Sequence, residues 1–126
     1  MKELTKKWLY FANQDLLVVE NNISNQELKE VIVFHLQQVL EKTLKGYIQE
    51  VINITPPKTH NLFHLISESK LEFTESQLLL VEELNFSYTE SRYPTSNELQ
   101  DFLTKDKLTE LFNGVKEIAK WIKMKL

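Results

Sequence analysis

The stretch "FHLQQVLEKTLKGYIQ", residues 34–49, decides the fold because its spacing is that of a long amphipathic helix. It carries enough apolar side chains for a helix that packs in a core: Phe34, Leu36, Val39, Leu40, Leu44 and Ile48. A second, polar stripe follows on the same 3.6-residue period, formed by His35, Gln38, Lys42 and Lys45. We expect this helix to span about residues 27–52. Pro56 and Pro57 follow it and cannot continue a helix.

Helical periodicity continues before this stretch. A first helix is expected over about residues 4–20, with a buried stripe that contains Trp8, Phe11, Ala12, Leu16 and Val19. Asp15 falls on the same stripe. Apolar residues also occupy the other faces of this helix, so we expect a second subunit to cover it.

Three further helices are predicted after the prolines. Thr59 is the expected cap of a short helix over residues 60–69, and Thr74 with Gln77 resembles a capping box for a helix that ends near residue 88. Residues 89–100 are predicted to be a loop, and a last helix covers about residues 104–125 with the cleanest apolar stripe. The sequence therefore predicts an all-α fold, an up-and-down bundle of four main helices plus one short helix, as a single domain over residues 1–126.

The composition narrows the class of protein. The chain has 126 residues, 42% of them hydrophobic and 26% charged, as in ordinary globular proteins. Without cysteine it forms no disulfide or thiolate metal site, which fits a reducing compartment. A net charge of −3 gives no overall attraction to nucleic acid. The start, "MKELTKKWLY", lacks the apolar core of a signal peptide, and no apolar run approaches the ~20 residues of a membrane span. We expect a cytoplasmic protein with no membrane association.

Several kinds of catalytic and cofactor site are not indicated. Gly46 and Gly114 are isolated, so no glycine-rich phosphate loop is present, and no Gly-x-Ser-x-Gly motif occurs. His60 and His64 have the spacing of two ligands on one helical face, but no third ligand is evident and the His-Glu-x-x-His pattern is not met. We predict no metal, no cofactor and no catalytic residue. His60 is expected to form a hydrogen bond near the start of the short helix, and Asp15 to support a polar core.

The polar stripe has two interpretations. His35, Gln38, Lys42 and Lys45 could contact a phosphate, above all if Arg92, the sole arginine, folds back onto them. A lysine stripe is more often a solvated helix face, with its histidine and glutamine bonded between helices. Both interpretations stay open from the residues alone.

Four segments together resemble the HEPN family of small helical bundles. They are "WLYFANQDLLVVE" from residue 8, with Ala12, Asp15 and Leu16; "FHLQQVLEKTLKGYI" from residue 34; "THNLFHL" from residue 59; and "SRYP" from residue 91. The order and spacing are similar to the family pattern over about residues 5–125. The resemblance implies a two-fold pairing through the long helices and a soluble intracellular setting. It also implies a nucleotidyltransferase partner, as in toxin–antitoxin pairs.

Many HEPN proteins are metal-independent ribonucleases that carry an arginine followed, four to six residues later, by a histidine. Here Arg92 is followed by Asn97, Glu98 and Leu99 at the corresponding positions, and no histidine occurs after His64. The histidine would be the proton-transfer group, and the arginine would stabilise the charge of the phosphate. We therefore do not carry ribonuclease activity over to this chain.

The favoured function is a non-catalytic homodimeric module. It binds a nucleotide, RNA or another phosphate-bearing ligand through His35, Gln38, Lys42, Lys45, Arg92 and Tyr93, or pairs with a nucleotidyltransferase. One alternative is a divergent ribonuclease that uses Arg92 with His35 or His60. Another is a purely structural dimerisation unit in which the polar stripe fixes the register of the helices.

Overall fold

The computed structural model describes residues 1–93 and 97–126. Its elements are α1 (Glu3–Asn22), a 3-10 turn η1 (Gln26–Leu28), α2 (Lys29–Tyr47), a π turn η2 (Ile48–Ile52), α3 (Leu62–Ser69), α4 (Glu75–Glu90), α5 (Asn97–Phe102) and α6 (Lys105–Lys123). These described residues form six α-helices and no strand. The predicted all-α class is therefore confirmed, with the four main helices α1, α2, α4 and α6 and the short α3.

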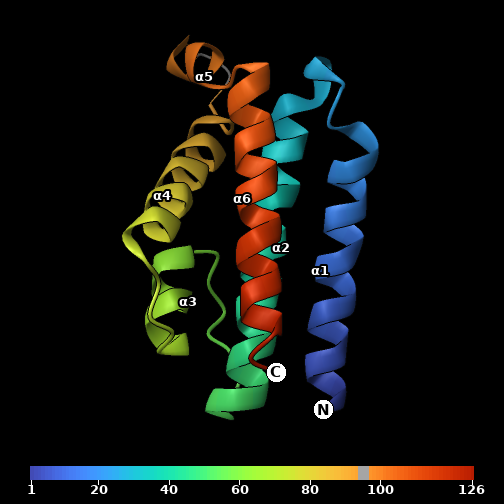
Figure 1. Cartoon of the computed structure of the whole chain (residues 1–126), viewed down its shortest axis with the longest axis vertical. Helices are drawn as coiled ribbons and strands as arrows, with labels where there is room; N and C mark the ends of the chain where they lie inside the picture. Colours follow the sequence, from blue (N-terminus) through green and yellow to red (C-terminus); the bar gives the residue numbers. More distant parts are fainter. Residues whose placement is uncertain (94–96) are drawn as a thin grey trace.

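The main helices run alternately up and down (Figure 1). α1 rises from the N-terminus, α2 descends, α4 rises and α6 descends, so both termini lie at the lower end. α6 lies in front of α2, with α1 on one side and α3 and α4 on the other. α2 contacts α1, α3, α4 and α6, which makes the stretch quoted above the centre of the bundle.

The hydrophobic core lies mainly between α2 and the helices around it. Every apolar residue predicted to face inward from α6 is buried: Leu108, Leu111, Phe112, Val115, Ile118, Ala119 and Ile122. The inward residues expected of the short helix, Leu62, Leu65 and Ile66, are also buried. Each fully buried Leu or Ile contributes about 1.5–3 kcal/mol relative to an exposed one, so this core is the main support of the fold.

Two helix caps test the sequence analysis. Thr74 forms the predicted capping box, because its hydroxyl accepts from the Gln77 N–H and the Gln77 side chain accepts from the Thr74 N–H. The predicted cap of the short helix is wrong. α3 starts two residues later, at Leu62, and is capped by Asn61, whose Oδ1 accepts from the His64 N–H. The Thr59 hydroxyl instead accepts from the Asn61 N–H.

Residues 94–96 of the predicted loop over residues 89–100 lie outside the described residues, and the prediction is only partly correct for the rest. α4 continues to Glu90, and α5 occupies Asn97–Phe102, with Leu99 buried in the core. Since α5 is six residues long and has a single buried residue, it leaves little periodic signal in the sequence.

Phe11 was also predicted to be buried, and this is wrong. Its side chain is 51% exposed, whereas Ala12, Asp15 and Val19 face the core with Thr5. Because α1 carries apolar residues on several faces, its pattern fits more than one inward direction. The same helix leaves Tyr10 and Leu17 exposed.

The N-terminus is tied to the π turn η2 and to Asn53, just after it. The Lys2 N–H donates to Glu50 Oε1 at 2.9 Å, and Lys2 Nζ donates to the Gln49 carbonyl at 2.8 Å and to Asn53 Oδ1. The hydrogen bond from the Lys2 backbone holds the pKa of Glu50 below its usual value. The π turn ends at Asn53, whose left-handed backbone (φ 63°) suits an asparagine. None of the helices in the described ranges could span a bilayer.

Candidate functional site: a polar layer on α2

Two alternate residues of the predicted polar stripe, His35 and Lys42, contact Asp15 on α1. Lys42 Nζ donates to Asp15 Oδ2 at 2.6 Å, and His35 Nδ1 lies 2.7 Å from Asp15 Oδ1. Because a carboxylate only accepts, the histidine donates from Nδ1 and keeps Nε2 for another partner. Asp15 is buried, so these contacts supply the hydrogen bonds that its carboxylate loses with water. The predicted support role of Asp15 thus has a geometric basis.

The other two residues of the stripe, Gln38 and Lys45, contact Glu41, which the sequence analysis did not select as a site residue. Glu41 Oε2 accepts from Lys45 Nζ at 3.1 Å, and Glu41 Oε1 lies 3.0 Å from His60 Nδ1. The side chains of Glu41 and Lys45 are only 4% and 8% exposed. A buried carboxylate and a buried ammonium group require each other, since either alone would carry a large desolvation cost.

Two glutamines complete this second cluster. Gln37 Nε2 donates to the His60 carbonyl at 2.8 Å, and Gln38 Nε2 donates to Gln37 Oε1 at 2.8 Å. Longer contacts join both amides to Glu41 Oε1, at 3.3 Å from Gln37 and 3.4 Å from Gln38. Gln38 therefore belongs with Glu41 rather than with Asp15. His60 makes the hydrogen bond expected near the start of the short helix, and it fastens the segment before α3 to α2.

Arg92 does not share a cluster with the two lysines. Its guanidinium carbon lies 5.8 Å from the ring centre of Tyr88, which stacks on Phe34 at 6.3 Å. Phe34 meets the edge of His35 at 5.2 Å. Arg92 is thus linked to His35, and through it to Asp15, by the rings of Tyr88 and Phe34. Arg92 and Tyr93 are both exposed at the end of α4.

The remaining histidine lies apart from both clusters. His64 is exposed on α3, and its Nε2 lies 3.6 Å from Glu68 Oε1. Within residues 1–93 and 97–126, no three His, Asp or Glu side chains gather in a way that could hold a metal ion. The structure brings together Asp15, His35 and Lys42 in one cluster, which we call the Asp15 cluster. It gathers Gln37, Gln38, Lys45 and His60 around Glu41 in another, the Glu41 cluster.

The sequence contained a signal for the residues that were missed. Gln37, Glu41 and Lys45 are spaced at i, i+4 and i+8, so they form one row on α2. Such a row usually lies in solvent. Here it faces the segment that carries His60, and this contact cannot be deduced from the local pattern.

These observations define a helical bundle with a polar layer on its central helix. The sequence model of the HEPN domain matches residues 5–125. Because the match covers nearly the whole chain, the protein belongs to the HEPN domain family. No curated protein and no solved structure matches the chain in comparable searches.

Proposed function

We propose that this protein is a non-catalytic HEPN module of one domain that acts by pairing with another protein chain, first of all with a second copy of itself. The observation that carries this proposal is the outward face of α1. Tyr10, Phe11 and Leu17 are 60%, 51% and 42% exposed, and the rings of Tyr10 and Phe11 contact each other at 5.3 Å. Grouped aromatic and aliphatic side chains on a soluble protein are typical of an interface.

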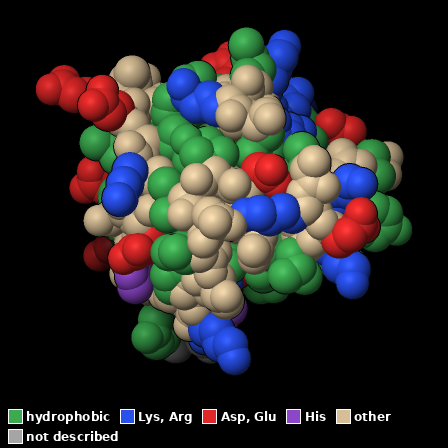
Figure 2. Space-filling model, turned by 90° about the horizontal axis from the view of Figure 1, so that it is seen from below, with side chains coloured by type: hydrophobic (Ala, Val, Ile, Leu, Met, Phe, Trp, Pro, Cys, Tyr) green, Lys and Arg blue, Asp and Glu red, His purple; other side chains and the backbone are tan. Residues whose placement is uncertain are grey.

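The state of the polar layer supports the same proposal. Lys42 and Lys45 each contact a carboxylate, so their charges are already balanced inside the bundle. At the lower end of the molecule, basic and acidic side chains are interspersed among hydrophobic ones in Figure 2. This visible end carries no broad area of positive charge among the described residues, which argues against nucleic acid as the main partner there.

The oligomeric state tests the proposal. Light scattering coupled to size exclusion should give twice the monomer mass of 14.9 kDa for the unmodified protein. Tyr10→Glu and Leu17→Glu should give the monomer mass, because a charge in an apolar interface loses its hydration. Leu79→Glu is the matched control, since Leu79 is 55% exposed on α4, away from α1. A monomeric parent protein overturns the homodimer.

A different protein is the second kind of partner that the exposed apolar face of α1 suits. The HEPN resemblance points to a nucleotidyltransferase, in a toxin–antitoxin setting. Co-purification of the two chains, repeated with Tyr10→Glu, tests this pairing. The expected result is a complex that forms with the unmodified protein and is disrupted by the substitution. A nucleotidyltransferase that co-purifies equally with the variant would exclude α1 as its docking face.

A phosphate-bearing ligand is the second candidate function. It is favoured by the exposed guanidinium of Arg92 beside exposed Tyr93, which could bind a phosphate and stack on a base. His35, Gln38, Lys42 and Lys45 would join only after leaving their present partners. Calorimetry with ATP, GTP and a short RNA should then detect binding that Arg92→Ala weakens. If millimolar nucleotide produces no measurable heat of binding, this function is excluded.

A divergent ribonuclease is the remaining alternative, because Asp15 orients His35 much as a carboxylate orients a general base. Incubation with total RNA tests it. Cleavage that His35→Ala abolishes would support His35 with Arg92, and loss with His60→Ala would support His60. Cleavage that survives both substitutions excludes the arrangement.

A further inference from the structure

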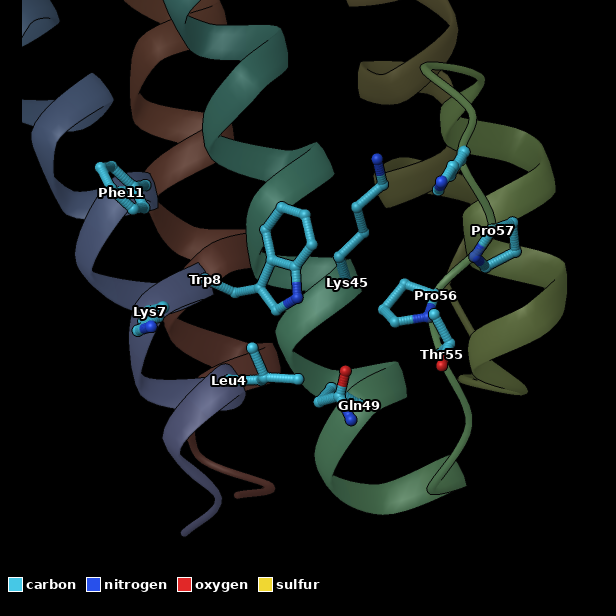
Figure 3. A pocket seen from close by; sticks show the side chains of 10 residues that line it. Leu4, Lys7, Trp8, Phe11, Lys45, Gln49, Thr55, Pro56 and Pro57 are labelled. Carbon is cyan, nitrogen blue, oxygen red and sulfur yellow. The ribbon is translucent and has the colours of Figure 1, made fainter.

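A cavity opens between the start of α1 and the segment that follows the π turn. Its volume is about 380 Å³, within the range of about 300–1,000 Å³ of small-molecule pockets. In Figure 3, Trp8 and Phe11 project from α1 on one side, Pro56 lies opposite on the link, and Lys45 and Gln49 rise from the floor. The cavity is separate from Arg92 and Tyr93.

Local backbone features shape this cavity. Gly46 lets α1 approach α2 closely, because a Cβ there would lie 3.3 Å from Leu9 and 3.4 Å from Trp8. The π turn at Ile48–Ile52 places Gln49 at the cavity, and π turns of this kind are frequent at functional sites. Pro56 and Pro57 make the opposite wall stiff and remove two backbone donors from it.

The chemistry of the lining selects a class of ligand. The wall is mainly carbon, and the indole of Trp8 supplies its largest flat surface. Among the described residues that line the cavity, every charged one is a lysine: Lys7, Lys45 and Lys58. Lys45 lies 5.4 Å from the Trp8 ring centre but is already paired with Glu41. Lys7 and Lys58 are exposed, so they face whatever enters from solvent.

We infer that this cavity binds a small organic anion with a flat aromatic body and a terminal carboxylate. The aromatic body packs between Trp8 and Pro56, and the carboxylate remains at the opening near Lys7 and Lys58. A neutral aromatic compound would gain the stacking but not the charge contact, and a cationic one would be repelled. The inference goes beyond the proposed pairing function and does not depend on it.

The test uses the full chain and three naphthalene probes of equal size: 2-naphthoate, neutral 2-naphthamide and cationic 2-naphthylmethylammonium. Calorimetry should give one site per chain, with naphthoate binding about fivefold tighter than the amide, the limit for a partly exposed charge pair. The cation should bind most weakly. Equal affinities for the three probes, or no saturable binding, overturn the inference.

Two variants locate the site. Trp121→Phe leaves Trp8 as the sole tryptophan, so naphthoate should quench or shift the remaining fluorescence. Gln49→Glu conserves shape but adds a negative charge to the cavity, and it should weaken naphthoate about fivefold while favouring the cationic probe. Gln26→Glu, exposed in η1, is the matched control and should change neither affinity. If Gln49→Glu also changes nothing, the anion binds elsewhere and the inference fails.

The second copy of the chain is the competing occupant of this cavity. Titrations at protein concentrations below and above the dissociation constant of the dimer distinguish a small anion from the second chain as the occupant. The expected result is an unchanged affinity for naphthoate. An affinity that falls as the dimer forms would show that the partner chain fills the cavity, and would overturn the inference.

Discussion

The Asp15 cluster and the Glu41 cluster use the same chemical groups in different surroundings. Each centres on one carboxylate that contacts one lysine and one histidine. In the Asp15 cluster, Lys42 and His35 are 22% and 23% exposed, so water still reaches them. In the Glu41 cluster the lysine and the carboxylate are almost fully buried, and only the His60 side chain is in solvent, at 73% exposure.

This difference separates two structural roles. The Asp15 cluster ties α1 to α2, and its loss can be relieved by water that hydrates the released cations. The Glu41 cluster ties the segment before α3 to α2, and its carboxylate and lysine are almost fully buried, so a charge left unpaired there is poorly hydrated. A buried pair adds little net stability compared with an apolar pair, yet breaking one half of it is costly. The two clusters should therefore respond very differently to single substitutions.

The largest expected effect comes from Lys45→Met. The methionine conserves much of the apolar stem but leaves the Glu41 carboxylate buried without its cation. The free energy of unfolding should fall by about 3–5 kcal/mol, as measured by urea denaturation. The double variant Glu41→Leu with Lys45→Met removes both charges and should be more stable than Lys45→Met alone. A double variant that is less stable would contradict the account of the cost as an unpaired charge.

Asp15→Asn should have a smaller effect. The substitution retains the shape of the side chain but removes the charge that accepts from Lys42 and His35. Hydrogen bonds to charged groups contribute about 1.5–3 kcal/mol, and partial exposure of both partners limits the loss to about 2 kcal/mol. Thermal and urea unfolding measure it. Glu20→Gln, exposed on the same helix, serves as the control and should stay within about 0.5 kcal/mol of the parent.

His60→Ala tests how far the Glu41 cluster holds the link. It removes the contact between Nδ1 and Glu41 but conserves the backbone carbonyl that accepts from Gln37. We expect a loss of about 1 kcal/mol, the usual net value of one hydrogen bond. His64→Ala is the matched control on the surface of α3 and should cost less. Equal losses in the two variants would indicate that the His60 side chain does not hold the link.

How much of this arrangement could be predicted depends on whether the signal was local. The stripe of α6 was predicted completely because its apolar residues occupy one face only. Phe11 was misplaced because α1 is apolar on several sides and the period alone does not choose between them. Thr59 and Asn61 are both good cap residues two positions apart, so the sequence did not discriminate between them.

The candidate site also could be predicted only as far as its signal was local. The row of His35, Gln38, Lys42 and Lys45 was visible as a helical repeat, but its division between two carboxylates was not. Asp15 and Glu41 lie on opposite sides of that row, and only the packing of α1 and of the link determines which lysine meets which acid. Charged residues are rarely buried, so nothing in the local pattern pointed to Glu41 as a buried site residue.

The ion pair between Lys107 and Glu83 extends the comparison to a more exposed case. Its 2.6 Å distance equals that of Lys42 and Asp15, but Glu83 is 22% exposed whereas Asp15 is 9% exposed. The hydrogen bond to Glu83 raises the pKa of Lys107 above its usual 10.5. Because the pKa is higher in the folded state, the stabilisation is fully present below pH 10.5 and is lost as pH rises through the folded value.

The Lys107 pair should therefore give the smallest effect of the series. At pH 7, Lys107→Met should cost less than about 1 kcal/mol, because solvent and salt screen the pair. The unfolding temperatures of the parent and the variant should then converge as pH is raised above 10.5. Sodium chloride at 1 M should reduce the difference at pH 7, while leaving the larger cost of Lys45→Met nearly unchanged. If salt reduced both costs equally, burial would not be what separates the two kinds of pair.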